Sequence, residues 1–349
     1  MTHEDVVLVG VDGSPASLHA VDWAAALAKV HGFGLHLVCS YSMPSFTAAA
    51  LDGGYAALDD TAIAEGARAV LDEAVARIAP TGVRTTSAVA TGDAAAILVE
   101  LSRGAAAVVV GTRGRGGFAE RLLGTVSSAL PAHAHCPTVV VPFRPEKPAA
   151  SSRGTGTTPQ EAATGPQEPV TGPEVAVAGG WAIGAPSEDA AGRPVVRRIV
   201  VGVDGSPAAE AALTRAVHEA EIWGAELTAL AAVPVGTGAG ILAWLPAAVD
   251  HEAVLRDVAE GLDVVVDRAL ADHPGVQVRR HVLDGTGAAL LTEFSSAVDL
   301  VIVGSRGRGG FAGLLLGSTS QAVLHHAACP VMVVTTRASA EEWSPTELS

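Results

Sequence analysis

The sequence predicts an α/β fold made of two tandem, doubly wound parallel sheets with five strands each. Three observations support this prediction. At 349 residues the chain exceeds the usual size of one core, two of its segments occur twice, and apolar strand-like runs alternate with helix-like runs. Apolar residues make up 49% of the chain and aromatic residues only 4%, a composition typical of strands that helices cover on both faces.

The repeated segments divide the chain into two copies. VGVDGSPA stands at residues 9–16 and again at 201–208, and VVVGTRGRGGFAERLLGT at 108–125 returns as VIVGSRGRGGFAGLLLGS at 301–318. Pro, Gly, Ser and Thr dominate the stretch between the copies, as in a linker. The expected parts are a first domain at 1–144, a linker at 145–194, a second domain at 195–337 and a C-terminal tail at 338–349.

The first copy opens with a strand and a capped helix. Residues 6–11 are almost continuously apolar, which predicts a buried strand. Ser14 then offers an N-cap and Pro15 a first-turn proline, so a helix is expected from there to about Val30.

The remaining elements continue the alternation of strand and helix. Short apolar or alternating runs predict strands, and longer runs with helical periodicity predict helices. The expected strands are 35–41, 83–90, 106–110 and 138–141, and the expected helices are 58–78, 94–101 and 125–134. The second copy repeats this order through residues 331–334. Strict alternation implies parallel strands with right-handed crossovers.

This topology predicts where a ligand would bind. Open α/β sheets bind ligands outside the carboxyl ends of their strands, where the strand order reverses. With the order 3-2-1-4-5, that point lies between strands one and four, where Asp12 and Gly111 would meet. The fifth strands, at 137–143 and 330–335, would be exposed apolar edges, so we expect the two copies to pack on each other as a pseudo-dimer. The whole chain could also form a homodimer.

The glycine-rich loop after the fourth strand has the features of a phosphate-binding loop. Its spacing is Gly111-x2-Gly114-x9-Gly124-Thr125 in one copy and Gly304-x2-Gly307-x9-Gly317-Ser318 in the other. Glycines allow positive φ and a close approach of backbone N–H groups, and the helix that follows offers free N–H groups to an anion. Further glycines, hydroxyl groups and arginines of these loops are Gly116, Gly117, Gly309, Gly310, Ser127, Ser320, Arg113, Arg115, Arg121, Arg306 and Arg308.

Several other classes of protein are disfavoured. Lys29 and Lys147 are the only lysines and neither follows a glycine, so no Walker loop can form. The turn after the first strand lacks the GxGxxG pattern of a dinucleotide-binding fold. A net charge of −15 argues against nucleic acid as a partner, and no apolar run is long enough for a membrane span, so a cytoplasmic protein without membrane contact is expected.

Both copies resemble the universal stress proteins, in particular their ATP-binding branch. Besides the glycine loop, each copy has the family's opening V-D-G-S-P and its closing C-P-x-x-V-V strand, and the resemblance covers about residues 4–143 and 197–335. It implies an adenine nucleotide alpha hydrolase-like fold, one ATP per copy with Mg²⁺ bound through the phosphates, and a role as a regulator of a stress response.

The resemblance also implies a role for each matching residue. Asp12 and Asp204 would lie near the adenosine, the backbone at Ser40 and Ala232 would border the adenine, and Gly10 and Gly202 would keep the floor of the crevice clear. The ribose and phosphates would be held by Gly111, Gly114, Gly124 and Thr125 in the first copy and by Gly304, Gly307, Gly317 and Ser318 in the second.

Alternative interpretations exist for several of these residues. The two aspartates could simply cap the following turn, and the arginines could be solvated. The clusters His133, His135, Cys136 and His325, His326, Cys329 are better explained as helix ends than as metal sites. Cys39, Cys136 and Cys329 are expected to be reduced, although a bridge between Cys136 and Cys329 is conceivable. A slow ATPase or autophosphorylating enzyme is the alternative to a regulator, and an interaction protein with an empty crevice is disfavoured.

Overall fold

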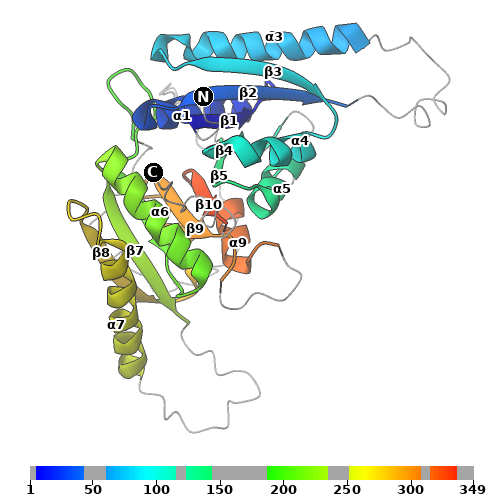
Figure 1. The fold of residues 1–349 in the computed structure, drawn as a ribbon. Coiled ribbons are helices and arrows are strands. Elements are labelled where there is room, and N and C mark those ends of the chain that lie inside the picture. Colours follow the sequence, from blue (N-terminus) through cyan, green and yellow to red (C-terminus); the bar gives the residue numbers. More distant parts are fainter. Residues whose placement is uncertain are drawn as a thin grey trace, which may run out of the picture.

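The computed structural model describes residues 5–42, 60–114, 123–143, 187–234, 251–307 and 315–335 of the chain. These residues form one ten-stranded sheet with the strand order β3-β2-β1-β4-β5-β10-β9-β6-β7-β8 (Figure 1). Each half has the expected order 3-2-1-4-5 with parallel neighbours, so the predicted fold class is confirmed. The two five-stranded halves join through β5 and β10, which pair antiparallel.

The elements of the two copies correspond one to one. In the first copy the strands are β1 Val6–Gly10, β2 Gly34–Tyr41, β3 Thr85–Thr91, β4 Ala107–Gly111 and β5 Thr138–Val141, and the α-helices are α1 Pro15–His31, α3 Asp60–Ile78, α4 Ala94–Leu101 and α5 Thr125–His133. In the second copy the strands are β6 Arg198–Gly202, β7 Glu226–Val233, β8 Val278–Asp284, β9 Leu300–Gly304 and β10 Val331–Val334, and the α-helices are α6 Pro207–Trp223, α7 His251–Ala269, α8 Gly287–Phe294 and α9 Ser318–His326. Most helices and strands begin and end within one or two residues of the positions that the sequence predicts.

The ends of α1 show why the sequence forms a helix there. The Ser14 Oγ accepts a hydrogen bond from the Ser17 N–H at 3.1 Å, and proline occupies the first turn. Gly32 ends the helix with a φ of 74°, in the left-handed region that favours glycine. Ser206 and Gly224 cap α6 in the same way.

Helices cover the sheet on both faces. Val7 and Val9 of β1 face one core together with residues of α1 and α3, whereas Leu8 faces the other core, with residues of α4 and α5. In the second copy, α6 and α7 lie on the first of these faces and α8 and α9 on the second. Both cores run through both copies, so the two halves share their hydrophobic interior.

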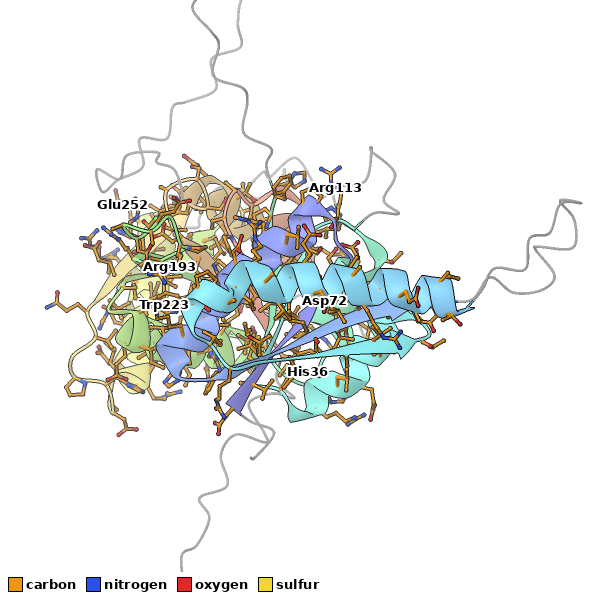
Figure 2. All side chains as sticks on the ribbon, turned by 90° about the horizontal axis from the view of Figure 1, so that it is seen from above. His36, Asp72, Arg113, Arg193, Trp223 and Glu252 are labelled. Atoms are coloured by element: carbon orange, nitrogen blue, oxygen red, sulfur yellow. The ribbon has the colours of Figure 1, made fainter. Side chains whose placement is uncertain are left out.

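A buried ionic cluster joins the two copies where α1 meets α6, on the side of the molecule where Figure 2 labels Trp223. The Glu219 carboxylate is fully buried and lies 3.1 Å from the Nε2 of His31, whose side chain is only 2% exposed. Arg215 Nε donates to Glu219 Oε1 at 2.8 Å, and Trp223 Nε1 donates to Glu219 Oε2 at 3.0 Å. One carboxylate of the second copy therefore accepts a contact from the first copy and two from its own helix.

The last residues of the expected linker are docked on the second copy. Asp299, which is 3% exposed, accepts hydrogen bonds from the backbone N–H groups of Ser187, Arg197 and Arg198, each at 3.0 Å. Glu188 and Pro194 form an antiparallel bridge just before β6. This carboxylate therefore holds the chain in place where it enters the second copy.

Other expectations concern cysteines, tryptophans and membrane contact. Cys39, Cys136 and Cys329 are free and buried, so the bridge considered between the last two is not formed. Trp23 is buried in the core, whereas Trp181 and Trp244 lie outside the described residues. Among the helices that the structure describes, none is both long enough and apolar enough to span a membrane.

Candidate ligand-binding crevices

Each copy has a cavity at the carboxyl ends of its strands, at the point where the strand order reverses. The first has a volume of about 340 Å³ and the second about 410 Å³, within the usual range for small-molecule sites. The structure brings together these predicted residues in the first copy: Gly10, Asp12, Ser40, Gly111, Arg113, Gly114, Gly124, Thr125 and Ser127. In the second copy it brings together Gly202, Asp204, Ala232, Gly304, Arg306, Gly307, Gly317, Ser318 and Ser320.

Close packing explains the glycines of the fourth strand and its loop. A Cβ at Gly111 would lie 2.6 Å from the carbonyl oxygen of Ala16 in α1, and one at Gly304 would lie 2.6 Å from the carbonyl oxygen of Ala208 in α6. A Cβ at Gly114 would collide with the Asp12 carboxylate, and one at Gly307 with that of Asp204. Side chains at these positions would therefore push α1 and α6 off the sheet or drive the aspartates from their places.

The loop glycines that the structure describes do not use the positive φ that glycine allows. Gly124 has a φ of −81° and Gly317 a φ of −75°, and neither Gly111 nor Gly114 has positive φ. The left-handed residues are instead Gly13 and Gly205, in the turns after β1 and β6. Lack of space for a Cβ explains Gly111, Gly114, Gly304 and Gly307, whereas a Cβ at Gly124 or Gly317 would make only ordinary contacts.

Asp12 caps the turn after β1 and also lines the cavity. Its Oδ1 accepts the Ser14 N–H at 3.0 Å and the Ser14 hydroxyl at 2.6 Å. The same hydroxyl lies 3.3 Å from the carbonyl oxygen of Arg113, so it ties the first turn to the glycine loop. In the second copy Asp204 Oδ1 accepts the Ser206 N–H at 2.9 Å, and the Ser206 hydroxyl lies 3.3 Å from the carbonyl oxygen of Arg306.

The N-termini of α5 and α9 open onto the cavities. The first N–H groups of an α-helix have no partners within the helix, and together with the helix dipole they favour an anion. Thr125 and Ser318 begin these helices and line the cavities. Ser127 and Ser320 are only 1% exposed, and their hydroxyls donate to the loop carbonyls of Thr112 at 2.8 Å and Ser305 at 3.2 Å. These two serines therefore hold the loop in shape.

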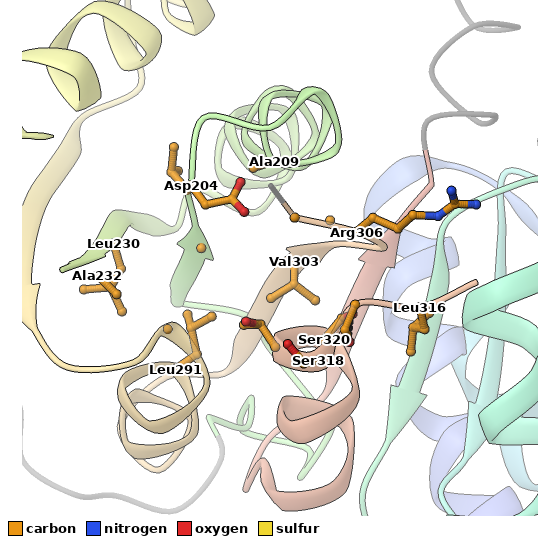
Figure 3. Close-up of a pocket in the computed structure, with 17 residues that line it drawn as sticks. Asp204, Ala209, Leu230, Ala232, Leu291, Val303, Arg306, Leu316, Ser318 and Ser320 are labelled. Carbon is orange, nitrogen blue, oxygen red and sulfur yellow. Dashed lines mark hydrogen bonds between the residues drawn. The ribbon is translucent and has the colours of Figure 1, made fainter. Parts of the chain in front are cut away.

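Figure 3 shows the second cavity with Leu230 and Ala232 of β7 on one side and Ser318 of α9 on the other. The carboxylate of Asp204 points into this space, whereas the side chain of Arg306 extends away from it. Arg113 of the first copy is exposed as well. The other predicted loop residues, Arg115, Gly116, Gly117, Arg121, Arg308, Gly309 and Gly310, lie outside the described residues.

Sequence reasoning missed the wall that the third helix of each copy contributes. Ala94 and Leu98 of α4 line the first cavity, and Gly287 and Leu291 of α8 line the second. A Cβ at Gly10 would lie 2.8 Å from Leu98 Cδ1, so this glycine makes room for the leucine that forms the floor. The signal was available, because a doubly wound topology brings the N-terminus of each helix to the carboxyl edge of the sheet.

The histidines of the two His and Cys clusters lie at helix ends. His133 ends α5, and His325 and His326 end α9. Within the described ranges, no group of three or more His, Cys, Asp or Glu side chains is arranged to hold a metal ion.

Comparison with known proteins gives the same two units. The model of the universal stress protein family matches residues 5–142 and 196–335. A universal stress protein from Mycobacterium tuberculosis is 32% identical over 341 residues, covering 94% of this chain and 95% of the relative. One from Mycolicibacterium smegmatis is 31% identical over 340 residues, covering 95% of this chain and 97% of the relative. The crystal structure of a universal stress protein from Archaeoglobus fulgidus has a similar fold, with a TM-score of 0.59 at 19% identity over 95% of this chain and 98% of that one.

Proposed function

The chain belongs to the universal stress protein family, and on this basis we propose that it binds one ATP molecule in each crevice and acts as a nucleotide-dependent regulator of a stress response. The observation that carries the proposal is the duplicated cavity. In both copies an aspartate after the first strand, tightly packed loop glycines and a helix N-terminus surround a space of the size of a small-molecule site.

The residues present are suited to the separate parts of a nucleotide. The N–H groups at the start of α5 and α9 would hold phosphate oxygens, which needs no lysine. The ends of β2 and β7, at Ser40 and Ala232, would border the base. Asp12 and Asp204 would contact the adenosine part rather than the phosphates, because a carboxylate accepts hydrogen bonds from sugar hydroxyls and repels phosphate.

Mg²⁺ would enter with the phosphates. The described residues offer no cluster of three ligating side chains, so the phosphate oxygens and water would supply most of its ligands. The protein would contribute binding, orientation and exclusion of water by Leu98 and Leu291 on the crevice floors. A regulator needs no more than this, because a bound ligand shifts the conformation or stability of the chain by differential affinity.

The direct test is analysis of the nucleotide that accompanies the purified protein, followed by calorimetry with ATP. We expect two binding sites in the parent protein and one in each of Gly114→Val and Gly307→Val, since each side chain would force an aspartate out of position. The matched controls are Gly66→Val in α3 and Gly261→Val in α7, where a Cβ meets nothing within 4 Å.

Failure of the parent protein to bind ATP would refute the proposal. Binding that disappears from both sites after a single change would refute the assignment of one independent site to each copy. Rapid turnover of labelled ATP, lost in Asp12→Asn and Asp204→Asn, would assign an ATPase instead of a regulator.

A further inference from the structure

The two crevices share their frame but differ in the bulk and polarity of one wall. Their volumes are about 340 and about 410 Å³, and Leu230 of the second takes the place of the smaller Val38 of the first. The differences that change bulk or polarity beside the strand end are Ser40 for Ala232, Ala94 for Gly287 and Val126 for Thr319.

In the first crevice this wall is closed. Ala94 begins α4 and places a methyl group on the wall, and Val126 of α5 adds an apolar side chain. The floor at the end of β2 carries the Ser40 hydroxyl.

In the second crevice the same wall is open. A Cβ on Gly287 would lie 3.6 Å from the methyl carbon of Thr319 and 3.9 Å from Cβ of Ala232, which are ordinary contact distances. The φ of Gly287 is not positive either, so neither packing nor backbone conformation requires glycine at this position. Gly304 and Gly307 are different, because a Cβ there would collide with backbone or carboxylate. The missing side chain at Gly287 therefore leaves space that a ligand could occupy, and an alanine there would not clash.

We propose that both crevices accept ATP, and that the second also accepts a purine base with one additional small group, for which Gly287 with Ala232 and Thr319 forms a shelf. This inference rests on the proposed nucleotide-binding function. The first crevice accepts a base the size of adenine, since the methyl group of Ala94 fills the equivalent space. The shelf suits a group the size of a methyl, because the methyl groups of Ala232 and Thr319 border it. The Thr319 hydroxyl lies 4.0 Å from the position that a Cβ on Gly287 would occupy.

The test compares ATP with ATP analogues that carry one methyl group at purine position 2, N6 or 8. Calorimetry on Gly307→Val reports the first site alone, and calorimetry on Gly114→Val reports the second. For at least one analogue, we expect the affinity relative to ATP to be about tenfold or more higher at the second site, the effect of one methyl group in a shaped pocket. Gly287→Ala in the second-site background should remove this preference, and Ala94→Gly in the first-site background should create it.

The control for Gly287→Ala is Gly261→Ala, which makes the same change in α7, away from the crevice, and should leave the affinity ratio unaltered. If ATP binds and no analogue distinguishes the sites, or if Gly287→Ala leaves the ratio unchanged, the selectivity proposal is overturned and nucleotide binding stands. If ATP binds neither site, both proposals are overturned.

Discussion

Replacing Glu219 by Gln is expected to destabilise the folded chain by about 3 kcal/mol at pH 7. The carboxylate is fully buried between the two copies and is contacted by His31, Arg215 and Trp223. Glutamine has the same size and can still accept one hydrogen bond. It carries no charge, however, and its amide N–H groups would face the donors of Arg215 or His31. The Arg215 side chain, which is only 13% exposed, would then lose its ion pair with Glu219.

The magnitude follows from the pKa of Glu219. Burial acts to raise this pKa, but the hydrogen bond from His31, the charges of Arg215 and His31 and the hydrogen bond from Arg215 outweigh it and lower the pKa from 4.5 to about 2. Since one pKa unit is equivalent to about 1.4 kcal/mol, the ionised carboxylate contributes about 3 kcal/mol relative to the neutral form. His218, whose ring lies 5.9 Å from that of His31, has its pKa lowered, mainly by burial.

The stability contribution of ionised Glu219 depends on pH. The folded pKa lies below the unfolded one, so the contribution is fully present above about pH 4.5 and is lost as the pH falls through about 2. The stability difference between the parent protein and Glu219→Gln should therefore be about 3 kcal/mol at pH 7 and should shrink steadily between pH 4.5 and pH 2.

Urea unfolding followed by tryptophan fluorescence measures the stability difference between the parent protein and Glu219→Gln. Trp223 reports on this site because its Nε1 donates a hydrogen bond to Glu219. The matched control is Glu221→Gln in the same helix, whose carboxylate is half exposed and pairs with His273 at 2.7 Å. An exposed pair of this kind contributes less than about 1 kcal/mol. Equal losses in the two variants, or a Glu219→Gln difference that persists unchanged at pH 2, would refute the reasoning.

Three further predictions concern other parts of the chain. Gly111→Ala should destabilise the protein by about 1–3 kcal/mol, because its Cβ would lie 2.6 Å from a backbone oxygen of α1; a melting temperature no lower than that of Gly66→Ala would contradict this. Asp299→Ala leaves three backbone N–H groups without their acceptor, so amide hydrogen exchange at Arg198 should accelerate by at least tenfold. Unchanged exchange would show that other contacts hold the chain where it enters the second copy. Arg121→Leu should weaken ATP binding at the first site about tenfold if its guanidinium contacts phosphate. Arg121 lies outside the described residues, and equal affinities of the two sites would leave the loop backbone as the main determinant.

The sequence predicted the parts of the structure that depend on local pattern. The parallel, doubly wound sheet followed from the alternation of elements. The crevice position followed from Asp12 and Gly111 at strand ends, given the strand order 3-2-1-4-5. The Glu219 cluster could not be predicted, because a glutamate in α6 has the same local pattern whether it faces solvent or the other copy. The reason for Gly111 was also beyond local pattern, since it depends on the approach of α1 across the sheet. The open wall at Gly287 needed the relative positions of three elements.

The contact between α1 and α6 also bears on how a duplicated chain can evolve. In a dimer of identical subunits, a two-fold interface presents every substitution twice, so a buried carboxylate would need its partners on both sides of the axis. Here the positions equivalent to Glu219 and His31 hold Leu27 and Trp223, so the acid occurs once and the imidazole once. Covalent linkage allows each copy to carry residues that match only the other copy. A chain with only one copy would therefore have an interface without its matching residues.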